Sequence, residues 1–386
     1  MIKKMKISVI MPYKKRLENI RMAFEAMAAQ TMEKSEFEII VGVMEYCEKY
    51  IAVCRQFIDR INICSILVNE EWNVAAARNA ALRQAAGEIL VILDADMVVP
   101  ANFLTNLYDR HFSFRQRQCV IGQMIDYSNN TENVDSVEIL PFSHYEKLLS
   151  ELEREQPFQK DTRWHVEHNI PWAFAWTALI ALPRTIVEQS SLLFDENFRG
   201  YGVEDLEWAY RISLSGVPLL LKHDVWGIHL PHARNVNSNQ LTEGSNYRYF
   251  LGKYPGYDVE IVSRLGDFQG NISYMEYKKE IEAVAHNANN LLSVLNGKVK
   301  GITTLVIGVI QDRNGNYLSD SSLPAVFDMG EEVISMPLAG ISLPFEDQSM
   351  EECFILPVIM GFSDKYKDLI FQECQRVSKK IQVKEK

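Results

Sequence analysis

The most informative stretch of the sequence is Glu88-Ile-Leu-Val-Ile-Leu-Asp-Ala-Asp-Met97, in which an unbroken apolar run leads directly into two aspartates. Five consecutive Ile, Leu and Val residues are typical of a strand that is buried on both faces of a parallel sheet. Ligands of open α/β sheets bind beyond the carboxyl ends of such strands. Asp94 and Asp96 stand there, and a divalent cation is the simplest partner for two acids at such an edge.

The composition restricts the class of protein. The chain has 386 residues, enough for two domains, and a net charge of −11. This acidity argues against a nucleic-acid binder that neutralises phosphates, although it allows a nucleotide held through a metal. No apolar run reaches the length of a transmembrane helix. The six cysteines are scattered, and we expect reduced thiols in a cytoplasmic protein.

Strand and helix patterns alternate through the first hundred residues. Strands are predicted at 6–11, 37–43, 63–68 and 89–93, with helices at 17–30, 45–61 and 73–86. This rhythm predicts an α/β fold with a parallel sheet and right-handed crossovers. A variable polar insertion is expected within 100–170, including 129–133.

The later part of the chain predicts a second α/β unit. A helix is expected at 204–215, a strand at 217–221, a polar loop at 226–239 and a spacer helix at 275–295. The alternation restarts near residue 302. We therefore expect a first domain at 1–270, a helical linker at 271–300 and a small Rossmann-like domain at 301–386.

Four groups of residues are candidates for chemistry, and each also has a structural explanation. Asp94 and Asp96 are either metal ligands or acids at a turn. Arg78 either reaches a nucleotide, where its planar guanidinium can stack on a base or pair with phosphate, or is a solvated helix charge.

The other two groups lie further along the chain. Glu204 and Asp205 stand at a helix start, where acids are favoured by the helix dipole, and a carboxylate there could also act as a general base. His229 and His232 are either structural or ligands of a metal such as Mn²⁺.

In this order, the groups resemble those of the GT-A glycosyltransferases, specifically the family 2-like enzymes. The Glu-Asp segment is also similar to that of chondroitin-polymerase and β-1,4-galactosyltransferase catalytic domains. The resemblance covers roughly residues 5–235. The matching segments are Ser8-Val-Ile-Met-Pro12, Phe37-Glu-Ile-Ile-Val41, Asn73, Ala77-Arg78-Asn79, Gly87-Glu88, Leu93-Asp94-Ala-Asp96, Phe194-Asp195-Glu196, Gly200-Tyr-Gly-Val-Glu204-Asp205, Arg211 and His229.

The resemblance implies a GT-A domain, that is, a Rossmann-like nucleotide-binding sheet with an acceptor subregion. It implies metal-dependent, inverting transfer of a hexose-type sugar from a nucleotide-diphospho-sugar, with UDP as the expected nucleotide and Mn²⁺ or Mg²⁺ as the cofactor. The acceptor would be a hydroxyl or thiol of a glycan or peptide. The implied metal ligands are Asp94, Asp96 and His229, and His232, from the same pair of histidines, is the fourth expected ligand.

The same resemblance assigns the remaining roles. Asp205 would be the catalytic base, and Glu204 would hold the acceptor. The implied donor-binding residues are Pro12, Glu45, Arg78, Asp94, Ala95 and Asp96. The sequence departs from the family at Val41-Gly-Val-Met-Glu45, where an aspartate pair is usual, and at Tyr13-Lys-Lys-Arg16. The cations of the latter segment would either meet phosphate or be solvated.

Other assignments remain open. Trp172, Trp176, Tyr201 and Trp208 could form an aromatic platform for an acceptor sugar or belong to the core. The C-terminal part faintly resembles class I methyltransferases but lacks their glycine-rich cofactor loop, so a degenerate module for acceptor binding or homodimer formation is expected. The alternative functions are a nucleotidyltransferase and a non-catalytic sugar- or peptide-binding protein.

Overall fold

The computed structural model describes residues 4–69, 72–126, 133–134, 136–155, 160–318 and 326–384. Most of the polar segment 129–133 lies outside these residues. The chain folds into two compact units. The first contains the chain up to Val166 and Pro171–Glu243, and the second contains Glu167–Ile170 and Gly244–Lys386.

The first unit is built on an eight-stranded sheet with the order β3-β2-β1-β4-β7-β6-β8-β5. Strands β1 to β4 are mutually parallel, whereas β7 is antiparallel to both β4 and β6. The strands are β1 (Ile7–Tyr13), β2 (Phe37–Val43), β3 (Ile63–Leu67), β4 (Ile89–Leu93), β5 (Met97–Val98), β6 (Cys119–Ile125), β7 (Leu179–Pro183) and β8 (Leu219–His229). Because β1 and β4 are parallel neighbours, the loops that follow them lie at one edge of the sheet.

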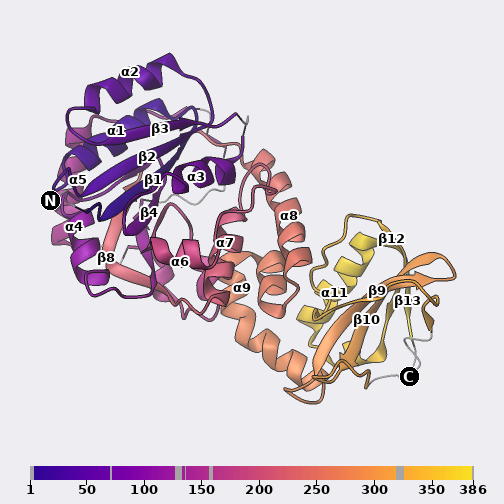
Figure 1. The fold of residues 1–386 in the computed structure, drawn as a ribbon. Helices are drawn as coiled ribbons and strands as arrows, with labels where there is room; N and C mark the ends of the chain where they lie inside the picture. The colour runs from indigo at the N-terminus through magenta and orange to yellow at the C-terminus, as the bar shows by residue number, and fades with distance from the viewer. Residues whose placement is uncertain are drawn as a thin grey trace. The chain divides into compact units, whose positions relative to one another are not determined.

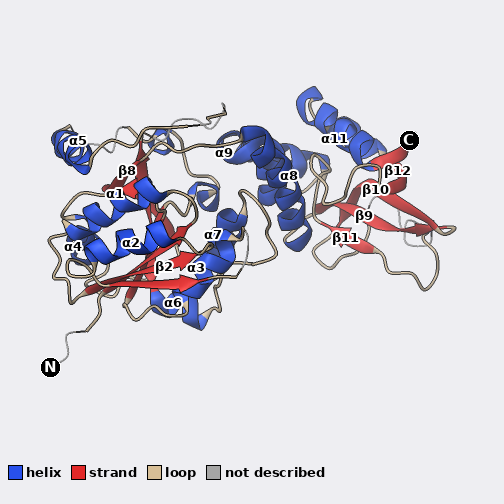
Figure 2. Cartoon of the chain, turned by 90° about the horizontal axis from the view of Figure 1, so that it is seen from above, coloured by secondary structure: helices blue, strands red, loops and turns tan. Residues whose placement is uncertain are grey.

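Helices cover both faces of this sheet. They are α1 (Leu17–Ala28), α2 (Glu48–Phe57), α3 (Val74–Leu82), α4 (Phe103–His111), α5 (Phe142–Arg154), α6 (Arg184–Gln189) and α7 (Glu204–Leu214). Helices α1 and α2 lie over one face and α6 over the other, as Figures 1 and 2 show from two directions. Alternate residues of β1, including Val9 and Met11, join the apolar core that also contains Phe24 of α1 and Phe57 of α2.

A glycine allows α3 to pack closely on β2. A Cβ atom at Gly42 would lie 2.1 Å from the carbonyl oxygen of Ala77 in α3. The alanine-rich sequence of α3 suits this approach, because its small side chains let the helix backbone come near the strand. This contact places Arg78, which follows Ala77, beside the edge of the sheet.

The second unit has a five-stranded sheet with the order β11-β9-β10-β12-β13. The strands are β9 (Leu291–Val299), β10 (Ile302–Gln311), β11 (Ile334–Met336), β12 (Met350–Ile355) and β13 (Ser378–Val383). The helices of this part are α9 (Tyr257–Val284), α11 (Asp364–Val377) and the second half of α8 (Val236–Lys253), which begins in the first unit. Lys300 and Gly301 have φ values of +53° and +77° and join β9 to β10, as expected for a two-residue hairpin turn.

The predicted α/β fold class and the second, smaller α/β unit are confirmed. The predicted helix over 275–295 is wrong in its second half, because α9 ends at Val284 and Leu291–Val299 is strand β9. His286 has a φ of +61°, which is incompatible with a continuing helix, and the apolar residues after it pair with β10. Strand β9 thus lies in the segment 271–300 that the sequence suggested as a helical linker.

Strand β8 is longer than predicted. It continues to His229, through residues that the sequence assigned to a loop, because β5 and β6 pair with it. Within the described residues, no helix combines the length and apolarity required to cross a membrane. All six cysteines are free, and three of them are buried.

Candidate active site

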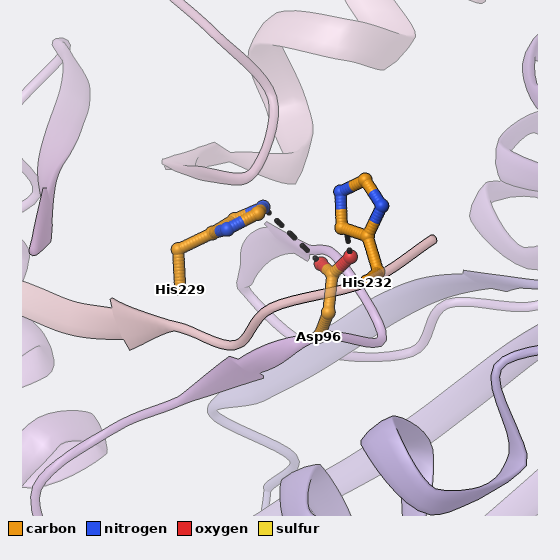
Figure 3. A group of neighbouring side chains, drawn as sticks. All are labelled: Asp96, His229 and His232. Atoms are coloured by element: carbon orange, nitrogen blue, oxygen red, sulfur yellow. Dashed lines mark ion pairs between the residues drawn. The ribbon is translucent and has the colours of Figure 1, made fainter. Parts of the chain in front are cut away.

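Three side chains form a cluster at the edge of the first sheet. Asp96 follows β4, and His229 and His232 lie at and beyond the end of β8. One ligand atom from each lies within 4.8 Å of the others. Figure 3 shows both imidazoles turned toward the Asp96 carboxylate; His229 Nε2 is 3.8 Å from Oδ1 and His232 Nε2 is 3.8 Å from Oδ2.

Backbone pairing holds this cluster together. Met97 in β5 pairs with His229 in β8, and the amide of Leu230 donates to the carbonyl of Asp96 over 2.7 Å. The short strand β5 therefore ties the loop after β4 to the end of β8. This pairing explains how residues far apart in the sequence reach one site.

The surroundings of Asp96 suit a bound cation. Its side chain is fully buried, and its Oδ1 atom accepts no hydrogen bond within the described part of the chain. Burial raises the pKa of the Asp96 carboxyl, whereas the charges of Arg16 and then of the two histidines lower it. The lowering is the larger effect, so the pKa lies below its ordinary value. A charged carboxylate with two imidazoles is a donor set that fits a divalent transition metal.

Arg78 is buried between two carboxylates. Its Nη1 atom donates to Glu204 over 2.8 Å, and its Nη2 atom donates to Asp94 over 3.2 Å. Its guanidinium also lies 5.2 Å from the ring centre of Phe194. Asp94 is partly exposed and lies outside the cluster of three ligands. Arg78 therefore connects the acid after β4 to the acids at the start of α7.

The start of α7 is a strained turn that presents Glu204 and Asp205. The preceding residue, Val203, is buried and has a φ of +76°, which is unfavourable for a β-branched residue. Such strain is found at functional sites more often than elsewhere. Asp205 accepts hydrogen bonds from the amides of Leu206 and Thr177, at 2.9 and 3.4 Å.

The environment of Asp205 changes its protonation. Burial and the neighbouring Glu204 raise its pKa to about 7, against the opposing effect of Arg78. A carboxyl with a pKa near neutrality can accept a proton in a reaction at that pH, which is the requirement for a general base.

Asn73, which precedes α3, and Asn79 within it belong to the segments that resemble the family, but the sequence assigned them no role. Asn79 donates to the carbonyl of Phe194 and the side chain of Glu196, both at 2.8 Å, and accepts from the amide of Phe194. Asn73 caps α3 and donates to the carbonyl of Glu196. Both are buried. The presence of asparagine among the alanines of this helix was the feature of the sequence that could have indicated a positioning role.

The remaining predicted donor-binding residues lie in strand β1 and in the loops after β2 and β4. Pro12 is buried in β1, and Ala95 is buried between Asp94 and Asp96. Glu45 accepts a hydrogen bond of 2.8 Å from the amide of Lys15, so it holds the loop after β1.

The four aromatic residues of the suggested platform separate into two groups. Trp208 is fully buried and stacks on Phe194, with ring centres 4.4 Å apart, and Trp172 is buried against Tyr210. These two belong to the core. Tyr201 is exposed, and Trp176 is partly buried against Arg163.

Another exposed aromatic residue lies near Tyr201. Trp72 is 44% exposed, and its indole donates to the carbonyl of Gly200 over 3.2 Å. No pattern in the sequence had singled it out. Lys14 lies over its ring, 5.4 Å from the centre.

The chain is similar in sequence to known glycosyltransferases. Residues 8–175 match glycosyl transferase family 2. Validoxylamine A glucosyltransferase of Streptomyces hygroscopicus subsp. jinggangensis is 24% identical over 267 residues, which are 64% of this chain and 61% of that protein. The uncharacterized glycosyltransferase YfnE of Bacillus subtilis is 22% identical over 281 residues, 65% of this chain and 71% of the relative.

The chain thus spans about three fifths of the length of the first of these relatives. Among solved structures, the mannosyltransferase PcManGT of Pyrobaculum calidifontis, in complex with GDP-Man and Mn²⁺, has a TM-score of 0.45 and 17% identity. That similarity covers 73% of this chain and 76% of the other.

Proposed function

We propose that the chain transfers a sugar from a nucleotide-diphospho-sugar to an acceptor, with a divalent metal and inversion of the anomeric carbon. The match of residues 8–175 to glycosyl transferase family 2 supports the transfer of a sugar. The observation that carries the proposal is the coexistence of two kinds of site. A cluster of possible metal ligands at Asp96 lies on the sheet edge, and Arg78 joins the same edge at Asp94 to Glu204, the neighbour of Asp205, whose raised pKa suits a general base.

The cluster would hold Mn²⁺ in preference to Mg²⁺. Mg²⁺ favours oxygen ligands in octahedral geometry, whereas two of the three side chains here are imidazoles, which divalent transition metals bind more readily than Mg²⁺ does. Asp96, His229 and His232 would be the ligands. A bound cation would neutralise the charge that develops on the departing nucleoside diphosphate.

The chain's own carboxylates would perform the proton transfer. Asp205 would take the proton of the acceptor hydroxyl or thiol while the acceptor atom attacks the anomeric carbon. The bond from that carbon to the diphosphate would break on the opposite side, and the electron pair would leave with the diphosphate. Glu204, fixed by Arg78, would orient the acceptor.

The substrates are proposed by chemical class. A UDP-sugar is our first choice of donor, and the acceptor would be a glycan or a peptide. Tyr201 and Trp72, whose rings are exposed beside the start of α7, offer apolar faces on which a sugar ring can pack.

The direct test is turnover of a panel of UDP- and GDP-sugars by the purified protein with Mn²⁺, measured as release of nucleoside diphosphate. Asp96→Ala should lower the metal-dependent rate more than about a hundred-fold. Mutation of residues that only hydrogen-bond to metal ligands lowers activity about ten- to a hundred-fold, and loss of a ligand itself should have a larger effect. Asp109→Ala, at an exposed acid of α4, is the matched control and should keep the rate. Full metal-dependent turnover by Asp96→Ala would refute the metal assignment. Release of pyrophosphate from a nucleoside triphosphate would favour a nucleotidyltransferase instead.

A further inference from the structure

Arg16 is paired with the carboxylate of Asp96, which would also be a ligand of the metal. It lies in the loop after β1, immediately before α1, and its Nη1 atom contacts Oδ2 of Asp96. The same oxygen lies 3.8 Å from Nε2 of His232. The guanidinium and a cation held by the cluster would therefore bind to one buried carboxylate at the same time.

The backbone directs Arg16 to this position. The preceding residue, Lys15, has a φ of +57°, in the left-handed region that most side chains avoid. Its amide is held by the Glu45 carboxylate over 2.8 Å. The contact of Arg16 with Asp96 thus depends on a fixed turn, although the Arg16 side chain itself remains 35% exposed.

A divalent cation at Asp96 would repel the guanidinium, since both are positive and both would lie against the same carboxylate. A donor substrate brings the compensating charge, because its diphosphate carries negative oxygens that a planar guanidinium binds well. The side chain is exposed enough to turn from the carboxylate toward a ligand at the sheet edge.

From these observations we propose that Arg16 couples the metal to the donor. It neutralises Asp96 in the free protein, weakens the binding of metal alone, and moves to the diphosphate when metal and donor bind together. This inference rests on the proposed function. It predicts that the nucleoside diphosphate strengthens metal binding and, by thermodynamic reciprocity, that the metal strengthens binding of the diphosphate.

The test measures binding and needs no turnover. Free Mn²⁺ is measured by electron paramagnetic resonance during titration of the full chain, with and without UDP or GDP. In Arg16→Gln, Mn²⁺ alone should bind on the order of ten-fold more tightly than to the wild type, and binding of the diphosphate in the presence of Mn²⁺ should weaken by a similar factor. Arg16→Lys keeps the charge and should keep the weak binding of Mn²⁺ alone.

Arg21→Gln is the matched control, because it removes a cation of α1 that pairs with Glu18 and does not contact the cluster. It should leave both affinities near the wild-type values, and circular dichroism should show that all variants are folded. Unchanged or weaker Mn²⁺ binding by Arg16→Gln would overturn the inference while leaving the proposed function intact. A wild type that binds neither Mn²⁺ nor diphosphate would instead refute the proposed function.

Discussion

Arg78 is the residue on which the acids of the site depend. It is 3% exposed and lies between Glu204 and Asp94, so its removal would leave the Glu204 carboxylate buried without its partner. We expect Arg78→Met to lower the free energy of unfolding by about 3–5 kcal/mol, as for other broken buried ion pairs. Urea unfolding, followed by tryptophan fluorescence, measures this change.

Arg83→Met provides the comparison. Arg83 directly follows α3, and its exposed side chain pairs with Glu196 at 3.3 Å. An exposed pair of this kind contributes about 1 kcal/mol or less. Equal losses of stability in the two variants would show that the burial of Arg78 has no energetic consequence.

The raised pKa of Asp205 predicts that activity and stability change in opposite directions with pH. Its pKa rises from an ordinary value of 3.8 to about 7 in the folded protein. The deprotonated form is the proposed base, so kcat/KM should rise as the pH rises through about 7. Between these two pKa values the folded state binds more protons than the unfolded state, so this group's stabilising contribution is present at low pH and is lost as the pH rises to about 7.

Asp205→Asn tests both statements. The variant should lose activity at every pH. Above pH 7 it should also be more stable than the wild type by roughly 1–2 kcal/mol, because it no longer holds a charged carboxylate in a buried site. Thermal unfolding at pH 5 and pH 8 measures the difference. A variant that is less stable than the wild type at pH 8 would contradict the prediction.

At the scale of elements, the packing of α3 on β2 depends on Gly42. A Cβ atom there would meet the backbone of Ala77 at 2.1 Å, and backbone atoms cannot turn aside as a flexible side chain can. We expect Gly42→Ala to lower the free energy of unfolding by about 1–3 kcal/mol, the usual cost of overpacking. Since α3 carries Arg78, the variant should also lose activity. Chemical denaturation and the donor assay measure the two effects.

Gly244→Ala is the control, because the same substitution is made where an added Cβ atom meets no close neighbour. Gly244 lies in α8, and the nearest atom to an added Cβ would be the side-chain Nη1 of Arg248 at 3.9 Å. Alanine is favoured over glycine in helices by up to about 1 kcal/mol, so this variant should be equally or more stable. A loss of stability similar to that of Gly42→Ala would indicate that the contact with α3 is unimportant.

The sequence predicted the regular elements of the first hundred residues well but not all of those beyond them: the expected polar insertion at 100–170 contains the fully buried strand β6 of the sheet. Strands β2 and β4 have the predicted bounds, and β4 is a continuous apolar run that ends at Asp94. Strand β9 was missed, since a short apolar run after a helix has no periodicity that separates helix from strand. The segment is a strand because it pairs with β10, and the local sequence pattern carries no information about that pairing.

At the scale of the molecule, the two units should respond differently to ligands. Each has its own sheet and its own apolar core, and the proposed donor and metal residues all belong to the first. We expect two transitions in scanning calorimetry. Mn²⁺ with UDP at about a hundred times the dissociation constant should stabilise the first unit by about 2.7 kcal/mol and leave the second transition unchanged.

A variant in the second unit identifies the transitions. Glu260 is buried and accepts hydrogen bonds from the amides of Ala339, Gly340 and Ile341 and from the hydroxyl of Tyr277. Glu260→Ala should lower the temperature of the second transition without changing the first. A single transition, shifted as a whole by both the ligand and the variant, would contradict independent units.

The sequence by itself determined the α/β class, the strand that ends at Asp94 and Asp96, and the candidate residues around them, because apolar periodicity and the order of motifs are local properties of the chain. Only the tertiary structure decided which of these residues meet. Pairing of β5 with β8 brings the two histidines to Asp96 and leaves Asp94 with Arg78. The contact of Arg16 with Asp96 joins residues from different loops, and such contacts depend on strand order and burial, which no local pattern contains.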